Sequence, residues 1–217
     1  MSTPVTIAVL AKAPTPGRVK TRLCPPCTPA QAAALAGAAL EDTLDAAGAV
    51  PFARHVLALD GDATSWTGRG FDVVPQRGHG LDERLAAAFA DIGGPTVLVG
   101  MDTPQVVPRQ LTSAAALLVS PGTGAVLGLA DDGGFWLVGL LTPDRDAFVG
   151  VPMSTDRTGR AQLTRLRARG RMVRRLPVLR DVDRWDDAVA VAADARGTRF
   201  ARTVATVAAD LRRVGVA

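Results

Sequence analysis

The segment from Ala11 to Leu23 gathers cationic side chains directly after a short apolar run. It reads AKAPTPGRVKTRL, and Gly17 would let the backbone approach a ligand closely. Its cations are Lys12, Arg18, Lys20 and Arg22. Lysine and arginine at this density suit a multiply charged anion such as a diphosphate. The segment is neither a P-loop nor a GxGxxG fingerprint, so its spacing alone leaves a solvated basic loop as the alternative.

A carboxylate ends a second apolar run, VLVGMDTP, in which Pro104 follows two residues after Asp102. An aspartate at the carboxyl end of a strand can ligate Mg²⁺ or Mn²⁺, and such an ion neutralises the charge that develops on a leaving phosphate. The alternative is that Asp102 caps the helix that follows, because Asp is a favoured N-cap residue.

A third segment, RDVDRWDD at 180–187, is rich in carboxylates. They belong to Asp181, Asp183, Asp186 and Asp187. Two of them could complete a metal site with Asp102. A helix that begins near Arg184 would also favour acidic residues in its first turn, and spacing alone favours that interpretation.

Alternating strands and helices are expected to position these segments. Strands are expected at 5–10, 54–59 and 96–101, and helices at 29–47, 81–92 and 108–119. Thr28 should cap the first helix, with Pro29 in its first turn. The alternation predicts a mostly parallel sheet with helices on both faces. Ligands bind at the carboxyl ends of strands in such sheets, which directs attention to the loops after Leu10, Met101 and Ala130.

The pattern changes after Gly124. Two apolar strands at 125–130 and 135–141 flank the turn DDGG and predict an antiparallel pair. Further helices are expected at 158–169, 184–195 and 198–213, with a strand at 172–179. The sheet should therefore be mixed.

Length and composition narrow the class of protein. The 217 residues are 47% hydrophobic and 21% charged, and no repeat or linker divides them, so we expect one domain spanning 1–217. The longest apolar runs fall short of the roughly 20 residues that a membrane-spanning helix needs, so no membrane span is expected. The sequence shows no secretory signal, which predicts a cytoplasmic location.

Arginines gather in the C-terminal third without indicating a nucleic-acid partner. The net charge is only +4, and the aromatic content is 4% with no Tyr, which leaves little material for stacking on bases. We interpret these arginines as a solvated helix face and expect no nucleic-acid partner.

The only cysteines, Cys24 and Cys27, form a CPPC segment. Such a pair can be a redox centre or half of a zinc site. No second cysteine pair exists to complete a zinc cage. We therefore interpret the two residues as a reduced pair in a loop.

Five motifs together carry a resemblance to a known family. They are KAPTPGRVKTRL, GMDTP, DDGGFWLVGL, STDRTG and DVDRWDD, and they span residues from about Val5 to Ala190. In order and approximate spacing they are similar to the DUF2064 family, also called radical-SAM/selenodomain-associated transferase 1. That family resembles the nucleotide-diphospho-sugar transferases with the GT-A fold and the 2-phospho-lactate guanylyltransferases. The resemblance implies a single-domain, GT-A-like (Rossmann-like) α/β three-layer sandwich with a mostly parallel mixed sheet.

The resemblance also implies roles for individual residues. Lys20, Arg22 and Asp102 would be catalytic. Asp102 and Asp183 would hold the metal, with Asp181 as the nearest alternative to Asp183. The nucleotide would be bound by Ala11, Lys12, Gly17, Arg18, Lys20, Arg22, Gln76, Gly80 and Arg84. The acceptor would be bound by Asp132, Gly133, Gly134, Thr155 and Asp156.

The activity that follows is a transfer reaction with Mg²⁺ or Mn²⁺ as cofactor. Its partners would be a nucleotide or nucleotide sugar and a small-molecule acceptor. The first expectation is glycosyl transfer from a nucleotide sugar. The alternative is guanylyl- or cytidylyl-type nucleotidyl transfer to a small phosphorylated acid, with release of pyrophosphate. A non-catalytic nucleotide-binding protein is the second alternative.

Overall fold

The computed structural model describes residues 4–213 and 215, and these residues form a seven-stranded sheet in the order β3-β2-β1-β4-β6-β5-β7. The strands are β1 (Thr6–Lys12), β2 (Arg54–Asp60), β3 (Asp72–Pro75), β4 (Thr96–Gly100), β5 (Ala125–Ala130), β6 (Phe135–Leu140) and β7 (Val173–Leu179). β1 pairs in parallel with β2 and β4, β2 with β3, and β5 with β7. β6 alone among them runs antiparallel to its neighbours, β4 and β5. The predicted mixed, mostly parallel sheet is confirmed.

Six α-helices and two short 3₁₀ helices accompany the strands within the described residues. The α-helices are α1 (Pro29–Gly48), α2 (Leu81–Ile92), α3 (Pro108–Leu118), α4 (Thr158–Ala168), α5 (Trp185–Asp194) and α6 (Arg199–Arg213). The 3₁₀ helices are η1 (Thr21–Leu23) and η2 (Arg145–Ala147). No helix in this part of the chain is long and apolar enough to span a membrane.

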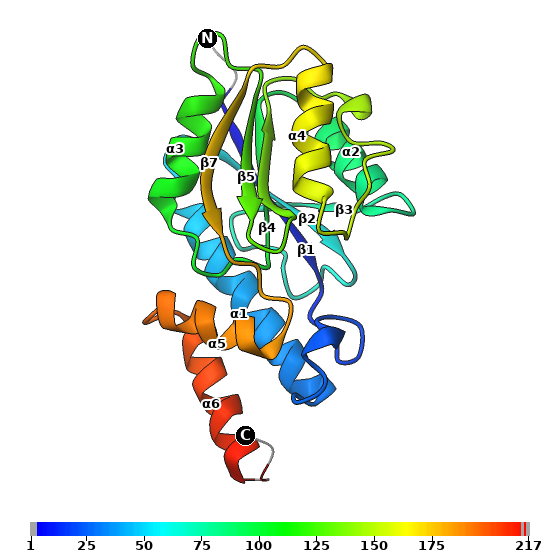
Figure 1. Ribbon diagram of the computed structural model, residues 1–217. Coiled ribbons are helices and arrows are strands. Elements are labelled where there is room, and N and C mark those ends of the chain that lie inside the picture. Colours follow the sequence, from blue (N-terminus) through cyan, green and yellow to red (C-terminus); the bar gives the residue numbers. More distant parts are fainter. Residues whose placement is uncertain (1–3, 214, 216–217) are drawn as a thin grey trace.

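The helices lie on both faces of the sheet, as the alternation predicts (Figure 1). Leu40 of α1 and Leu111 of α3 are buried in one apolar cluster with Val9 and Val99 of the sheet. Phe89 of α2 and Leu166 of α4 belong to a second cluster, on the opposite face. Residues alternate between the two faces of a strand, which is why both clusters draw on the same strands. The result is a three-layer α/β sandwich.

A third apolar cluster joins the outer side of α1 to the two C-terminal helices. Leu35 of α1, Val191 of α5 and Phe200 of α6 are buried in it, and Figure 1 shows α5 and α6 packed on α1 away from the sheet. Leu23 and Cys27, from the loop before α1, are buried in the same cluster. Burial on two sides explains why α1 is rich in Ala and Leu all around. The C-terminal helices therefore support the loop that precedes α1.

Local signals place α1 where the sequence predicts it. The backbone N–H of Gln31 donates to the Thr28 hydroxyl at 3.2 Å, and the Thr28 N–H donates back to the Gln31 side-chain oxygen at 2.9 Å. This reciprocal capping box, followed by Pro29, starts the helix. Strand β3 was not predicted. Its four residues form a partly exposed edge, so they carry little hydrophobic pattern.

Candidate active site

Two cavities adjoin at the carboxyl ends of the parallel strands. The first, which we call the loop cavity, measures about 330 Å³ and lies against the segment after β1. The second, the acidic cavity, measures about 440 Å³ and reaches from β4 to the β5–β6 turn and the segment 154–158. Both are lined by Leu10, Arg22, Leu81, Asp102 and Asp183. These shared residues form the border between the two cavities.

The loop cavity contains most of the residues predicted to bind a nucleotide. Its lining includes Ala11, Lys12, Arg18, Lys20, Arg22 and Gln76. Gly17, Gly80 and Arg84 do not belong to this lining. Gly17 turns the loop with φ of 74°, Gly80 is the N-cap of α2, and Arg84 forms an ion pair with Asp60 at 2.7 Å.

Gln76 holds two strand ends together instead of presenting a free amide. Its Nε2 donates to the carbonyl of Ala11 at 2.7 Å and to that of Ala58 at 3.0 Å. Ala11 lies on β1 and Ala58 on β2, so the side chain bridges neighbouring strands at the cavity. Gln76 therefore shapes the floor of the loop cavity.

Lys20 is the most buried cation that lines the loop cavity, and it lies next to the border. Its side chain is 10% exposed, and its Nζ lies 2.5 Å from Asp102 Oδ1 and donates to the carbonyl of Val182. Burial alone would lower the pKa of Lys20, but the carboxylates of Asp102, Asp181 and Asp183 outweigh it and raise the pKa above its usual value. The backbone of Lys20 is left-handed (φ 49°, ψ 38°), a conformation that costs energy for a residue with a Cβ. The fold thus holds a charged ammonium group among carboxylates.

Asp102 follows β4 and does not cap the next helix. Helix α3 begins at Pro108, and its N-cap is Val107, so the capping alternative is wrong. The Asp102 carbonyl instead accepts a hydrogen bond from the N–H of Val182 at 2.9 Å. This bond brings the segment after β7 to the end of β4.

The segment 181–187 divides its carboxylates between a helix and the cavities. Asp187 accepts from the N–H of Arg184 at 2.9 Å, and Asp186 also lies in the first turn of α5, as the helix interpretation expects. Asp181 and Asp183 precede the helix and line the acidic cavity. Asp183 Oδ2 accepts from Arg22 Nη1 at 2.9 Å. The helix interpretation is therefore confirmed for Asp186 and Asp187, while a metal-binding role for Asp181 or Asp183 stays a prediction.

The neighbouring carboxylates and burial change the pKa of Asp181. Burial, and next the negative charge of Asp102, raise its pKa to about 8, while Lys20 acts in the opposite direction. Within the described residues no three Asp, Glu, His or Cys side chains are grouped closely enough to hold a metal ion by themselves. A divalent ion here would need oxygen ligands from a bound molecule as well.

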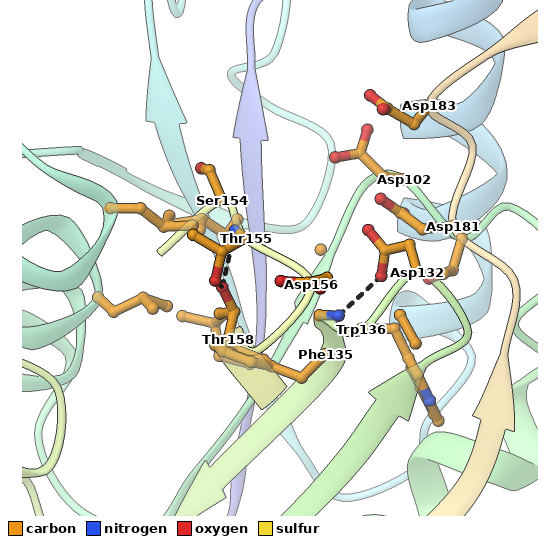
Figure 2. A pocket seen from close by; sticks show the side chains of 18 of the residues that line it. Asp102, Asp132, Phe135, Trp136, Ser154, Thr155, Asp156, Thr158, Asp181 and Asp183 are labelled. Atoms are coloured by element: carbon orange, nitrogen blue, oxygen red, sulfur yellow. Dashed lines mark hydrogen bonds between the residues drawn. The ribbon is translucent and has the colours of Figure 1, made fainter. Parts of the chain in front are cut away.

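The acidic cavity contains four of the five residues predicted to bind the acceptor. Asp132, Gly134, Thr155 and Asp156 line it, while Gly133 does not. Figure 2 shows Asp183, Asp102, Asp181 and Asp132 along one side of the cavity, with Ser154 and Thr155 on the other.

Close backbone contacts join two walls of the acidic cavity, the β5–β6 turn and the segment 154–159. The N–H of Gly159 donates to the carbonyl of Gly133 at 2.8 Å, and a Cβ at Gly133 would lie 2.0 Å from the carbonyl oxygen of Asp156. Gly133 therefore lets the β5–β6 turn contact the segment that carries Thr155 and Asp156.

Several lining residues were not predicted from the sequence. They are Leu81, Leu85, Thr103, Phe135, Trp136, Ser154 and Thr158. The apolar members look like ordinary core residues in a sequence, so no local pattern distinguishes them. Thr103 is 1% exposed, and its hydroxyl oxygen has no hydrogen-bond partner among the described residues. The one sequence signal that could have identified Thr103 is its position directly after Asp102, a predicted metal ligand.

Solved structures share this fold. A protein from Desulfovibrio desulfuricans G20, provisionally described as a nucleotide-diphospho-sugar transferase, is 27% identical, with 99% of this chain and 97% of that chain covered and a TM-score of 0.83. Rv0371c from Mycobacterium tuberculosis H37Rv, in complex with manganese, is 27% identical over 88% of this chain and 98% of that one, with a TM-score of 0.50. A cytidylyltransferase from Leptospira borgpetersenii shares the fold at 12% identity, 96% and 95% coverage and a TM-score of 0.58.

No match was found among curated proteins. A family model matches residues 43–155, and the family is described as uncharacterized proteins conserved in bacteria (DUF2064). Since this match covers more than half of the 217 residues, the chain belongs to the DUF2064 family.

Proposed function

We propose that this protein is a metal-dependent transferase that moves a sugar from a nucleotide-sugar donor to a small-molecule acceptor. The observation that carries the proposal is the meeting of a cationic loop cavity and an acidic cavity at Asp102, Asp183 and Arg22. A transfer reaction needs two adjoining binding sites with the reacting atoms at their border. The similarity to the D. desulfuricans protein, which is provisionally described as a nucleotide-diphospho-sugar transferase, supports the choice of donor.

The loop cavity suits the diphosphate of the donor. Arg18 and Lys12 are exposed along its lining, and Arg22 stands at the border. Guanidinium groups pair with phosphate oxygens in a bidentate manner. Among the described residues, Asp102 and Asp183 at the border are the only carboxylates that line this cavity. The donor's phosphates would therefore lie in the loop cavity, with the sugar directed toward the border.

The border carboxylates fit a divalent cation. Mg²⁺ and Mn²⁺ are usually held by one or two protein carboxylates together with phosphate oxygens of the substrate, and Asp102 and Asp183 offer such a pair. The manganese complex of Rv0371c supports the use of a divalent ion but does not identify its ligands in this chain. What the ion supplies when bound is neutralisation of the charge that develops on the diphosphate.

The chemistry at the border would be electrostatic and positional. A hydroxyl oxygen of the acceptor attacks the anomeric carbon, the bond from that carbon to the diphosphate oxygen breaks, and the electron pair leaves with the nucleoside diphosphate. A carboxylate of the acidic cavity accepts the proton that the hydroxyl loses. Lys20, beside the border residue Asp102, and Arg22, at the border, stabilise the leaving diphosphate because both carry positive charge.

Nucleotidyl transfer is the second candidate, because cytidylyltransferases share the fold and the same cations could bind a triphosphate. In that reaction the acceptor attacks the α-phosphorus and pyrophosphate leaves. Product analysis separates the candidates: glycosyl transfer yields a nucleoside diphosphate, nucleotidyl transfer yields pyrophosphate, and a non-catalytic binding protein returns the nucleotide unchanged.

The test begins with thermal-shift measurements of nucleoside triphosphates, diphosphates and nucleotide sugars, each with and without Mn²⁺. A ligand at about 100 times its Kd should stabilise the fold by ~2.7 kcal/mol. Asp102→Ala should abolish the metal-dependent part of this stabilisation while the protein stays folded. Asp186→Ala, which removes a carboxylate from the exposed first turn of α5, is the matched control. An unchanged nucleotide response in Asp102→Ala would overturn the metal assignment.

A further inference from the structure

The charged groups that line the acidic cavity are almost all negative. Its carboxylates belong to Asp102, Asp132, Asp156 and Asp183, and Asp181 is a fifth acidic side chain in the lining. Arg22 is the one cation in this lining within the described residues, and it is paired with Asp183 at the border. Lys20 faces Asp102 from the loop cavity. The positive charge of the site is therefore confined to the border and the loop cavity.

Two carboxylates lie beyond that border, away from the proposed metal ligands. Asp132 accepts a hydrogen bond from the N–H of Gly134 at 2.8 Å, and no cation lies within ion-pair distance of it among the described residues. Asp156 is 3.9 Å from Arg157 Nε, but both side chains are more than 80% exposed, so solvent screens that pair. An anionic ligand that displaced the water around Asp132 and Asp156 would meet negative charge that no nearby cation neutralises.

The polar groups of the cavity favour a ligand that donates hydrogen bonds. Ionised carboxylates only accept hydrogen bonds, so a ligand beside Asp132 and Asp156 must bring O–H or N–H groups. The Thr103 hydroxyl is buried to 1% exposure and has no partner among the described residues, although its residue lines the cavity. A buried polar group without a partner is costly, and a hydroxyl or amine of a ligand would satisfy it.

The same cavity offers an apolar surface. Leu81, Leu85, Phe135 and Trp136 all line it. Leu81 is 37% exposed, which leaves an apolar side chain available at the cavity. Phe135 is half-buried, whereas Leu85 and Trp136 are already buried. A ligand with an apolar part would therefore gain from removing the exposed surfaces of Leu81 and Phe135 from water.

We infer that the acceptor of this enzyme is an uncharged or cationic molecule that carries hydroxyl or amine groups and an apolar part. A phosphate or carboxylate acceptor is disfavoured. The inference rests on the proposed function in treating this ligand as the acceptor, and it argues against a small phosphorylated acid as the second substrate.

Three probes of matched size and apolar part test the charge preference. They are phenyl β-D-glucoside (neutral), its 2-amino-2-deoxy analogue (cationic) and phenyl β-D-glucuronide (anionic). Binding is measured by ligand-observed NMR at low ionic strength, without nucleotide or metal. We expect the neutral and cationic probes to bind with Kd values at least tenfold lower than that of the glucuronide.

Variants tie the binding to the cavity. Asp132→Asn/Asp156→Asn should shrink the difference between the cationic and anionic probes, whereas Asp186→Asn/Asp194→Asn, which removes two exposed carboxylates of α5, should leave it unchanged. Thr103→Val should weaken binding of the neutral probe without lowering the melting temperature, because the hydroxyl it removes has no partner in the protein.

Two results with the charged probes overturn the inference: the glucuronide binds as tightly as the amine, or the cavity double variant behaves like its control. The inference is also overturned if the neutral and cationic probes show no binding up to about 10 mM, a concentration at which even a weakly bound fragment is detected. Failure of the proposed function is a separate result. It would show as the lack of a metal-dependent response to every nucleotide, in an experiment that contains none of these probes.

Discussion

Lys20 combines two energetically unfavourable features, a left-handed backbone and a buried charge. Its backbone is left-handed, its ammonium is buried, and its charge is balanced by Asp102, Asp181 and Asp183. Crowded carboxylates repel one another, so the ammonium stabilises the arrangement of the segment after β7 against β4. A divalent ion bound by Asp102 and Asp183, as proposed, would also reduce the repulsion between these carboxylates.

Lys20→Met should expose this balance. We expect the free energy of unfolding to fall by about 1–2 kcal/mol, less than for a fully buried pair because Asp102 is 42% exposed. Mn²⁺ should restore part of the loss, since it replaces the missing positive charge, and should affect the wild type less. Urea unfolding with and without Mn²⁺ measures both effects.

Lys12→Met is the matched control for this variant, because Lys12 is an exposed cation of the same loop cavity. It should change stability little. A Lys20→Met protein as stable as the wild type and indifferent to Mn²⁺ would contradict the balance described here.

At the level of elements, the acidic cavity depends on contact between the β5–β6 turn and the loop before α4. Gly133, with φ of 91°, allows the contact, and the Gly159–Gly133 hydrogen bond holds it. The two walls of the cavity come from separate segments, since Gly134 and Ser154 are 20 positions apart, so their alignment depends on this contact.

Gly133→Ala should therefore disturb the cavity as well as the backbone. Its new Cβ would clash with the Asp156 carbonyl, whereas Gly122→Ala, at φ of 76°, meets open space. Both variants incur the left-handed penalty of about 1 kcal/mol or more, so only the clash distinguishes them. Denaturant unfolding should show the larger loss for Gly133→Ala, and equal losses would mean that the contact contributes nothing.

A second contact between elements makes stability depend on pH. Asp144, before η2, forms ion pairs with Arg171 at 3.1 Å and Arg169 at 3.2 Å, two residues of the segment between α4 and β7. Burial alone would raise the pKa of Asp144, but the hydrogen bonds and charges of the two arginines lower it below its usual value. A carboxyl with a depressed pKa in the folded state stabilises the protein above the unfolded pKa of about 3.9.

Asp144→Asn should remove that contribution. We expect the variant to be less stable than the wild type at pH 6 by about 1–3 kcal/mol, and the difference to shrink as the pH falls below about 4, where Asp144 becomes protonated in the wild type. Urea unfolding of both proteins at pH 6 and pH 3 measures it. A difference that stays constant over this range would be inconsistent with the depressed pKa.

In the molecule as a whole, the C-terminal helices support the loop between β1 and α1, which we propose binds the nucleotide. Leu23 and Cys27 of that loop are buried in one cluster with Phe200 of α6. The N–H groups of Arg199 and Phe200 donate to Asp42 of α1 at 3.1 and 2.7 Å, which fixes α6 on α1. Order at the site therefore depends on residues at the far end of the chain.

Phe200→Ala should loosen the loop. The variant should lose about 3–5 kcal/mol of stability through the cavity it creates. Burial, with a smaller effect of Cys24, raises the pKa of Cys27 to about 11, so its thiol should react slowly at pH 8 in the wild type. Iodoacetamide labelling followed by mass spectrometry should show faster alkylation of Cys27 in the variant.

Phe148→Ala provides the comparison, because Phe148 is equally buried but belongs to the cluster on the opposite face of the sheet. It should lower stability to a similar extent without accelerating Cys27 labelling under native conditions. Equal acceleration in both variants would indicate global unfolding instead of a loosened loop.

The local signals in the sequence predicted most of the elements. The 81–92 helix and the 125–130 strand have the predicted bounds, and the other predicted elements differ by one or two residues at their ends. Hydrophobic period and capping residues act over a few residues, which is why they can be read without the fold. The unpredicted strand β3 is short and partly exposed, so its side chains carry little of that pattern.

The tertiary structure alone determined how the chemical groups meet. Asp102 and Val182 are 80 positions apart, yet a backbone hydrogen bond joins them, and Lys20 bonds to both. Such long-range contacts depend on strand order and on the closing of long loops, and local sequence periodicity carries no information about either. The chain's residue types implied a phosphate loop and acidic partners, whereas the border between a cationic and an acidic cavity exists only once the parallel strands end at one edge.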